Sequence, residues 1–462
     1  MTALVWMRRD LRVRDHPALR DALHAHDRVL TVFCLDDRLL SGRHASGPRT
    51  QFMLECLQDL DDSLNERGGA LVIRRGPPER ELPKLARAAG AEAVYFTGDV
   101  SPCARERGKR VSAALTEHGI QLHACPGLTV VDDVTAIETG KGGPYTVFSP
   151  FHRTWETVPR REVLQAPRTL TKPEVEHGTI PTLEDLGLKQ EVDDPMRGGE
   201  TEGRRRLSNF LRSGLDDYGE NHDALGADKT SRLSPYLHFG CVSPLEVERR
   251  ATNHDFRRQL AWRDFYHHVL FHHPANATEE FQARYRRAID WDHDHDAFRA
   301  WCEGSTGFPL VDAGMRQLKR EGWMHNRARL VVGSFLTKDL GIDWRLGERW
   351  FMRHLIDGDE ANNNGNWQWI ASVGVDPQPH YRRIYNPARH MERYDPRGEY
   401  VRRYVPELKN VPDEYLAEPW TMPDDVQQRC NTTIGRDYPE PIVDHRAARE
   451  RALERYRAAA AG

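Results

Sequence analysis

Short apolar runs alternate with amphipathic stretches over the first 130 residues of the chain. The apolar runs predict strands at 3–7, 29–35, 70–74, 93–97 and 121–124. The stretches between them have a helical period and predict helices near 17–26, 50–67, 79–89 and 103–118. Strands that alternate with helices form a parallel sheet with helices on both faces. The pattern therefore predicts a doubly wound α/β domain over residues 1–130.

The pattern changes at about residue 131. Prolines punctuate the stretch up to residue 200, which is typical of an extended connection: Pro144, Pro150, Pro159, Pro167, Pro173 and Pro181. Beyond residue 201 only helix-period segments follow, at 203–213, 243–251, 254–272, 310–320, 323–338, 345–355 and 445–460. We expect an inter-domain linker over 131–200 and an all-α domain over 201–462.

Composition and charge favour a globular protein of the cytoplasm. The 462 residues are 39% hydrophobic and 29% charged, and no apolar run approaches the roughly 18 residues of a membrane span. The first residues become charged too early for a secretory signal, and the seven cysteines contain no C-x-x-C pair. Because the net charge is −4, a polyanionic partner would have to be bound by a local cationic patch.

Eight of the eleven tryptophans lie between residues 262 and 369. Tryptophan stacks well on bases and flavins, although a tryptophan-rich helical core would give the same count. The segment DGDEANNNGNWQW, residues 357–369, combines carboxylates and amides with two of these tryptophans. Each buried amide needs hydrogen-bond partners, and we expect a polar aromatic ligand, not a core helix, to supply them.

Two helical segments have faces that mix amide, aromatic and cationic groups. In GWMHNRARL, residues 322–330, helical spacing aligns Asn326, Arg329 and Leu330. The segment 258–269 similarly aligns Gln259, Trp262, Arg263 and Tyr266, a set that suits a base or a flipped nucleotide.

Two further segments have groups that bind phosphate. KTSRLSPYL, residues 229–237, places Thr230, Ser231 and Ser234 beside Arg232, where the hydroxyls could hold phosphate oxygens or simply cap a helix. Seven arginines interleaved with tyrosines lie between residues 380 and 403. Such a strip is typical of nucleic-acid binding, with an ordinary charged surface as the alternative.

Other catalytic classes lack their motifs. His268 and His272 have the i, i+4 spacing of ligands on a helix, and the run WDHDHD at 291–296 resembles a ligand cluster, but no E-x-x-H or cysteine partner accompanies them. We assign these histidines structural or solvated roles and expect no metal site. The chain also lacks a G-x-S-x-G elbow and a G-x-G-x-x-G nicotinamide fingerprint.

Together these segments resemble the photolyase/cryptochrome family, most closely its bacterial class I cyclobutane pyrimidine dimer (CPD) photolyases. TSRLS (230–234), GFPLVDAGMRQL (307–318), GWMHNR (322–327) and the segment 357–369 occur in the family's order. The resemblance extends from RRDLR (8–12) to about His445. It implies a carbon–carbon lyase that repairs DNA with light: reduced FAD excited by blue light donates an electron to a flipped dimer and splits it. The implied partner is UV-damaged DNA, and a monomer is expected.

The resemblance also implies roles for individual residues. The FAD-binding residues would be Tyr218, Thr230, Ser231, Arg232, Leu233, Ser234, Asp357, Asp359 and Asn363. Trp367, Trp344 and Trp291 would relay electrons from the surface, and Gln259, Asn326 and Asn363 would be catalytic. The residues that bind the dimer and its DNA would be Trp262, Arg263, Arg327, Arg329, Leu330 and Trp369.

Two positions differ from the class I pattern. Gln259 stands where class I enzymes usually have Glu, and Leu330 where Met is frequent. Gln is typical of (6-4) photolyases at this place, but those enzymes have a pair of histidines in the segment where this chain has His325 and Asn326. We expect CPD repair, with a (6-4) photolyase or a cryptochrome blue-light sensor as alternatives; a dark flavoprotein oxidoreductase lacks its nicotinamide motif.

The resemblance finally implies an antenna chromophore in the α/β domain. Asp10, Asp36 and Asp99 follow predicted strands, and ligands of doubly wound sheets bind at the carboxyl ends of strands. We favour 8-hydroxy-5-deazaflavin, with folate as the alternative. Folate-binding relatives have a Cys-Lys pair where this chain has Ala277 and Thr278, although His44 and Glu106 match them.

Overall fold

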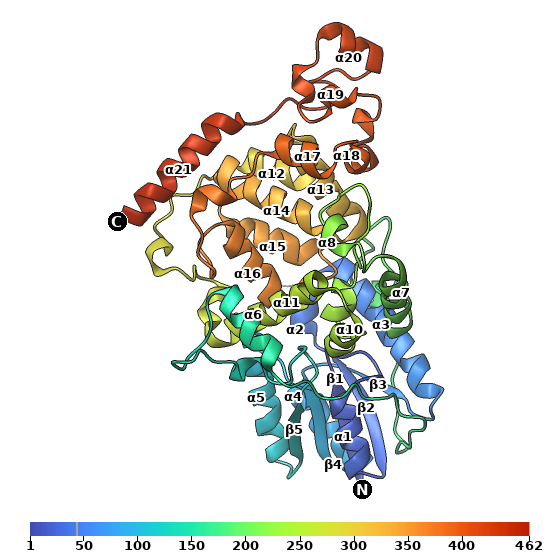
Figure 1. Cartoon of the computed structure of the whole chain (residues 1–462). Coiled ribbons are helices and arrows are strands. Elements are labelled where there is room, and N and C mark those ends of the chain that lie inside the picture. Colours follow the sequence, from blue (N-terminus) through green and yellow to red (C-terminus); the bar gives the residue numbers. More distant parts are fainter. Residues whose placement is uncertain (43–44, 462) are drawn as a thin grey trace.

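A five-stranded parallel sheet forms one end of the molecule, and a larger helical body covers the carboxyl ends of its strands (Figure 1). The computed structural model describes residues 1–42 and 45–461. The strands are β1 (Thr2–Met7), β2 (Arg28–Leu35), β3 (Leu71–Arg75), β4 (Ala91–Thr97) and β5 (Gln121–Cys125), in the order β3-β2-β1-β4-β5. Between them lie α1 (Pro17–Ala25), α2 (Asp37–Leu40), α3 (Gly47–Asn65), α4 (Pro78–Ala89) and α5 (Pro102–Thr116). The doubly wound fold predicted from the sequence is confirmed.

The central strand β1 is buried along its whole length. Because side chains alternate across a sheet, Ala3, Val5 and Met7 join the hydrophobic cluster under α1 and α3. Leu4 and Trp6 point to the other face and join the cluster under α4 and α5. Helices therefore cover both faces of the sheet, and polar groups can gather only at its ends.

The chain after β5 is mostly irregular until residue 200. It contains α6 (Phe148–Thr157), which the sequence pattern did not predict and which packs against α11. The helical body then contains α7 (Glu200–Ser213), α8 (Tyr218–Asn221), α9 (Ser234–His238), α10 (Pro244–Arg250), α11 (His254–His272), α12 (His295–Glu303), α13 (Pro309–Glu321), α14 (Asn326–Ser334), α15 (Trp344–His354), α16 (Glu360–Ile370), α17 (Pro387–Tyr394), α18 (Glu399–Tyr404), α19 (Asp413–Leu416), α20 (Asp424–Cys430) and α21 (His445–Ala461). No helix in residues 1–42 and 45–461 has the length and apolarity that a bilayer crossing requires.

The single helix predicted over 323–338 has a different form. It begins at Asn326, because the side chain of His325 caps the helix by accepting a hydrogen bond from the backbone N–H of Arg327. The chain then continues from Phe335 to Asp339 as a π-helix. The prediction was correct about the helix and wrong about its beginning.

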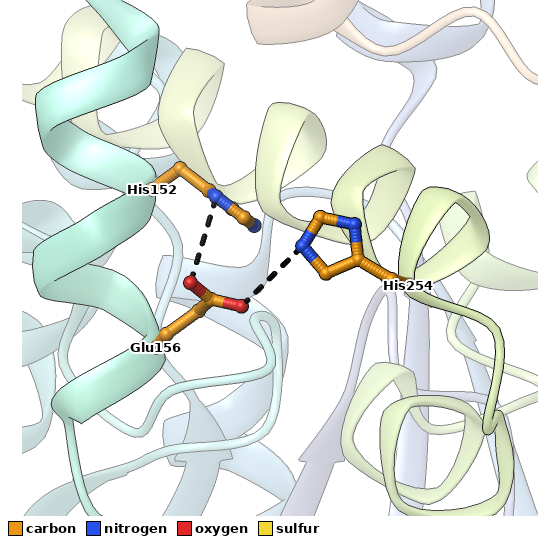
Figure 2. Close-up of side chains that lie close together, drawn as sticks. All are labelled: His152, Glu156 and His254. Carbon is orange, nitrogen blue, oxygen red and sulfur yellow. Dashed lines mark ion pairs between the residues drawn. The ribbon is translucent and has the colours of Figure 1, made fainter.

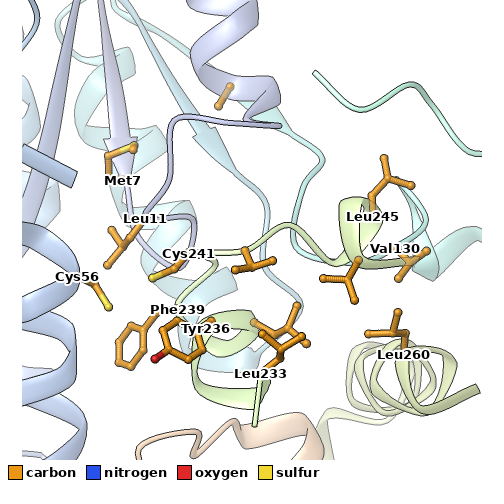
Figure 3. Packing of buried hydrophobic residues seen from close by; sticks show 14 of the residues in the cluster. Met7, Leu11, Cys56, Val130, Leu233, Tyr236, Phe239, Cys241, Leu245 and Leu260 are labelled. Carbon is orange, nitrogen blue, oxygen red and sulfur yellow. The ribbon is translucent and has the colours of Figure 1, made fainter. Parts of the chain in front are cut away.

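One hydrophobic cluster joins the sheet to the helical body. Figure 3 shows Met7 and Leu11 beside Tyr236, Phe239 and Cys241, which come from the other region of the chain. The backbone N–H of Leu11 donates to the carbonyl of Phe239 at 3.0 Å. This cluster fixes the end of β1 against the loop that follows α9.

Candidate functional site

A cavity of about 470 Å³ lies within the helical body. This volume is in the range of small-molecule and cofactor sites. The predicted site residues that line it are Tyr218, Thr230, Ser231, Arg232, Leu233, Ser234, Gln259, Trp262, Arg263, Asn326, Arg329, Leu330, Asp357, Asp359, Asn363, Trp367 and Trp369. The fold thus brings together segments spread from residue 218 to residue 369 of the sequence. Trp344, Trp291, Arg327 and the three aspartates of the α/β domain do not line this cavity.

The loop before α9 contributes hydroxyl groups to one part of the cavity. Thr230 Oγ1 is buried and has no hydrogen-bond partner among the described residues. Arg232 donates to Asp228 and Glu321 at 2.9 and 2.8 Å, and its guanidinium lies 4.4 Å from the ring centroid of Trp323. These contacts hold Arg232 in place. A buried hydroxyl without a partner is costly, so this wall is suited to a ligand with polar oxygens.

Asp357 has one free oxygen at the cavity wall. Its Oδ2 accepts a hydrogen bond from Arg329 Nη2 at 2.8 Å. Its Oδ1 is buried and finds no partner within the described part of the chain. Asp357 can therefore accept a hydrogen bond from a ligand while Arg329 compensates its charge.

Asp359 is held by a cation from the α/β domain. It caps α16 by accepting from the backbone N–H of Asn362 at 2.9 Å, and it forms an ion pair with Arg9. Burial by itself would raise the pKa of Asp359, but Arg9 holds this pKa well below its ordinary value. Burial lowers the pKa of His238 and His267 to about 4, so both rings near Asp359 are neutral at pH 7. The carboxylate of Asp359 therefore stays ionised next to the cavity.

The amides of α16 find partners in the protein itself. Asn363 Nδ2 donates to the backbone carbonyl and the carboxylate of Glu348, both at 3.0 Å. Gln368 bonds the backbone of the 276–281 segment and Asn364. The expectation that a core helix would not hold such amides is wrong, because α15 offers acceptors to Asn363 and the 276–281 segment offers them to Gln368. Asn363 nevertheless lines the cavity with an amide whose orientation Glu348 fixes.

Aromatic side chains form the mouth of the cavity. Trp262 stacks on Phe148 of α6, with ring centroids 3.7 Å apart and planes 7° from parallel. The guanidinium of Arg383 covers the ring of Trp369 at 3.8 Å, and Trp369 Nε1 is a buried donor without an acceptor in the described structure. Gln259 is exposed on α11, one turn before Trp262. The mouth therefore offers flat apolar surfaces with donors at their edges.

The three arginines predicted to contact the DNA backbone all have acceptors in the protein. Arg263 Nη1 donates to the carbonyl of Leu128 at 2.7 Å. Arg327 pairs with Asp223, and Arg329 with Asp357. Of the arginines at 380–403, Arg383 is buried, whereas the following are exposed: Arg382, Arg389, Arg393, Arg397 and Arg403.

The predicted relay residues lie on α15, α16 and the irregular segment before α12. Trp367 packs against α15 at Gly347, where a Cβ atom would come within 2.2 Å of the indole. Trp344 is buried one turn earlier on α15, and Trp291 is half-buried near Tyr456. Trp367 also has a ring contact that the sequence did not suggest, with Trp301 at a centroid distance of 6.2 Å. Nothing in the spacing of Trp301 distinguishes it from a core residue.

The three aspartates proposed for the antenna lie at the carboxyl ends of β1, β2 and β4 and have protein partners. Asp10 is fully buried and accepts from Thr97 Oγ1 and from the backbone N–H of Arg8, both at 2.6 Å. Asp36 caps α2, and Asp99 accepts from the backbone N–H of Ser101 at 2.9 Å. His44, which matches folate-binding relatives, lies outside the described residues.

His268 and His272 have the structural role expected of them. His268 accepts from the backbone N–H of Tyr145 through Nε2 at 3.0 Å, and its Nδ1 bonds the carbonyl of Val134. His272 bonds the carbonyl of Thr135 at 2.9 Å. Both rings hold the loop after β5 against α11.

Comparisons with known proteins agree with this geometry. Residues 3–171 match the family described as DNA photolyase, and residues 256–458 match the FAD binding domain of DNA photolyase. A deoxyribodipyrimidine photo-lyase of Streptomyces griseus is 41% identical over 97% of this chain and 98% of its own. The chain belongs to the DNA photolyase family.

Solved structures of photolyases have the same fold. A bacterial class III photolyase from Agrobacterium tumefaciens superposes with a TM-score of 0.93 at 35% identity, covering 100% of this chain and 98% of its own. An archaeal photolyase from Sulfolobus tokodaii, described with two FAD molecules, gives 0.86 at 30% identity over 99% and 100% of the two chains. A relative at 37% identity over 96% and 98%, from Natronomonas pharaonis, is named Cryptochrome DASH.

The cavity of this photolyase-family chain fits FAD. The unpartnered Thr230 Oγ1, Asp357 Oδ1 and Trp369 Nε1 are polar atoms of its lining that a dinucleotide cofactor could satisfy. All nine residues predicted to bind FAD line it. Arg9 and Glu348, which position Asp359 and Asn363, were not among the predicted residues, and only contacts in the folded chain identify them.

Proposed function

We propose that the chain is a light-driven DNA repair enzyme that binds FAD in the 470 Å³ cavity and splits cyclobutane pyrimidine dimers in UV-damaged DNA. The observation that carries this proposal is the cavity itself, whose lining combines the unpartnered oxygens of Thr230 and Asp357 with the aromatic rings of Trp262 and Trp369. A cofactor and a flat, flipped lesion can bind there in contact. The enzyme acts as a monomer of the cytoplasm.

The inner residues bind and orient the cofactor. Thr230, Ser231 and Ser234 offer hydroxyl groups to its phosphates, and Asp357 offers an acceptor. Asn363 presents an amide that Glu348 holds in one orientation. Bound FAD, once reduced and excited by blue light, supplies the electron that opens the dimer and takes it back.

The outer residues bind the lesion and exclude water. Trp262 and Trp369 provide the surfaces on which unstacked bases rest, and such stacking contributes about 1–3 kcal/mol per base. Gln259 and Asn326, both exposed at the mouth, donate hydrogen bonds to base carbonyls. The Gln259 amide can donate at any pH but cannot release a proton.

Repair of defined lesions tests the proposal. Oligonucleotides that contain one CPD or one (6-4) photoproduct are mixed with purified, FAD-loaded enzyme, under blue light or in the dark. We expect restoration of the CPD strand only in the light and no restoration of the (6-4) strand. Restoration of the (6-4) strand alone would show that the substrate is the (6-4) photoproduct and not the CPD.

A cryptochrome light sensor is the second candidate, because a relative of 37% identity is named Cryptochrome DASH. A sensor would bind FAD and respond to blue light but restore neither lesion. The lesion assay under light therefore separates the two functions.

We also propose an antenna chromophore, with 8-hydroxy-5-deazaflavin favoured and folate as the alternative. One support is the position of Asp10, Asp36 and Asp99 at the carboxyl ends of neighbouring strands. Another is the photolyase from Sulfolobus tokodaii, whose structure is described with two FAD molecules that imply a novel light-harvesting cofactor. Reconstitution with each compound, followed by absorption spectroscopy, tests the proposal. If neither compound binds, the antenna proposal is wrong.

A further inference from the structure

Three potential metal ligands meet on the surface where α6 contacts the beginning of α11. His152 and Glu156 lie one turn apart on α6, and His254 is the first residue of α11 (Figure 2). Their ligand atoms all lie within 4.8 Å of one another. No other group of three His, Cys, Asp or Glu side chains in residues 1–42 and 45–461 comes this close. The site is separate from the FAD cavity, since none of the three residues lines it.

The distances between these side chains are too long for hydrogen bonds between them and are nearer to the separations of ligands around one metal ion. Glu156 Oε2 is 3.8 Å from His152 Nδ1, and Glu156 Oε1 is 3.8 Å from His254 Nε2. Both separations exceed the limit of a hydrogen bond. Ligands bonded to zinc at about 2.0–2.2 Å in a tetrahedral arrangement lie about 3.3–3.6 Å from each other. The two carboxylate–imidazole separations would have to shorten by a few tenths of an ångström, and any pair of ligand atoms near the 4.8 Å limit by about one ångström, to reach such a geometry.

Aromatic rings lie beside the first imidazole of the cluster, and a second carboxylate lies near the other imidazole. The ring of His152 stacks on Phe148 and Trp155, at centroid distances of 5.5 and 6.0 Å. Asp255 Oδ1 is 3.8 Å from His254 Nδ1, the nitrogen that does not face Glu156. A carboxylate that accepts a hydrogen bond from a histidine ligand is a recurring feature of zinc sites. Asp255 would have to approach His254 by roughly half an ångström to make that hydrogen bond.

We propose that His152, Glu156 and His254 bind one divalent transition-metal ion of the zinc type. Two imidazoles and one carboxylate are borderline ligands that select such ions over Mg²⁺ or Ca²⁺. The remaining coordination position belongs to water, because Glu156 and His254 are 41% and 65% exposed. The ion joins α6 to α11 and so supports Phe148, on which Trp262 of the cavity mouth stacks.

Cobalt titration of the untagged full-length chain tests the site. Metal is first removed with a chelator, and Co²⁺ is then added while the visible absorption bands of the bound ion are recorded. We expect one equivalent to bind and Zn²⁺ to displace it. His254→Ala and Glu156→Gln should each weaken binding by at least about tenfold. Both positions are partly or largely exposed, so neither change disturbs the core.

The control is His118→Ala, which removes an exposed histidine outside the cluster and should bind Co²⁺ like the unaltered chain. A thermal denaturation series gives a second measure, since an ion that binds only the folded state raises Tm. Zn²⁺ should raise Tm in the unaltered chain and in His118→Ala, but not in His254→Ala. Equal Co²⁺ affinity in the unaltered chain and His254→Ala, or the absence of saturable binding, would overturn the proposal.

Discussion

Gln259 is an exposed amide at the rim of the cavity, and we expect it to contact the lesion. Its amide is exposed on α11, one helical turn before Trp262, so it can reach a base that rests on that indole. A neutral hydrogen bond of this kind contributes about 0.5–1.5 kcal/mol net, which would modulate repair without being essential to it.

We predict that Gln259→Glu raises the CPD repair yield per absorbed photon modestly and that Gln259→Leu lowers it. A carboxylic acid can give a proton to the carbonyl where negative charge collects, whereas leucine offers no donor. Counting photons with defined CPD oligonucleotides measures both effects. The lesion assignment is wrong if the Glu variant loses CPD repair while the native enzyme repairs (6-4) lesions.

We predict that Trp344→Phe leaves FAD bound but blocks photoreduction of the oxidised flavin by an external thiol. Phenylalanine keeps an aromatic ring at this buried position but is much harder to oxidise than tryptophan. Loss of flavin absorbance under blue light is the measurement. Trp301→Phe is the matched variant, because Trp301 is also buried and contacts Trp367. If the Trp301 variant were blocked and the Trp344 variant bleached normally, the relay would run through Trp301 instead.

At the scale of elements, the contact between α11 and α16 sets the shape of the cavity. Gly365 lies in this contact, where a Cβ atom would come within 2.2 Å of the ring of Tyr266. The helices can approach only because residue 365 has no side chain. Tyr266 and the neighbouring Trp367 both line the cavity.

We predict that Gly365→Ala destabilises the protein by about 1–3 kcal/mol, since an extra methyl group in a packed contact forces the helices apart. Gly108→Ala is the control. Gly108 lies inside α5, and a Cβ atom there would meet nothing within 4 Å. The control should gain about 0.5–1 kcal/mol, because alanine favours a helix over glycine. Urea denaturation measures both, and equal effects of the two changes would contradict the packing argument.

The hydrophobic pattern of the sequence predicted the five strands correctly, but it did not predict which tertiary partners the polar side chains would find. The five strands were found because a buried parallel strand is an unbroken apolar run. Helix α16 was misjudged, because the acceptors of Gln368 belong to residues about 90 positions away. The sequence identified Arg327 as a site residue, but it gave no sign that Arg327 pairs with Asp223, which lies 104 positions earlier in the chain. Spacing identifies which residues share a face, and only the tertiary fold decides what that face meets.

At the scale of the whole molecule, we expect DNA binding to depend on a local cationic patch. The net charge is −4, and Arg263, Arg327 and Arg329 already have acceptors in the protein. We therefore expect the exposed arginines of 382–403 to neutralise phosphates.

We predict that affinity for damaged duplex falls steeply with salt, and that Arg382→Gln with Arg389→Gln reduces the log–log slope by about 1.8, at about 0.9 per phosphate contact. Arg87→Gln, an exposed arginine on α4, is the control and should leave the slope unchanged. Binding titrations over a range of salt concentrations measure the slope. An identical slope in the double variant would show that Arg382 and Arg389 do not contact DNA phosphates.

The ion pair between Arg9 and Asp359 connects the sheet to the cavity and predicts a pH effect. Because the folded pKa of Asp359 lies well below the ordinary value, the pair stabilises the fold above that value and loses its effect only in acid. Arg9→Gln leaves a buried carboxylate uncompensated and should cost about 3–5 kcal/mol at pH 7. In the variant the pKa of Asp359 rises, so the deficit should shrink as the pH falls from 7 to 5. Urea denaturation between pH 5 and 7 measures the loss of unfolding free energy and its change with pH. A loss that does not depend on pH would show that it comes from packing and not from the charge of Asp359.

The cluster that joins Met7 and Leu11 to Tyr236 and Phe239 also bears on how the protein is made. The ribosome adds about 5–20 residues each second, so the apolar surface around Leu11 waits roughly ten to fifty seconds for residues 236–241 to be synthesised. During that interval the apolar surface at the carboxyl end of the central strand β1 lacks its partner residues from the helical body. We therefore expect chaperones to bind a nascent chain of this length. The rate of translation then sets how long the apolar surface stays exposed.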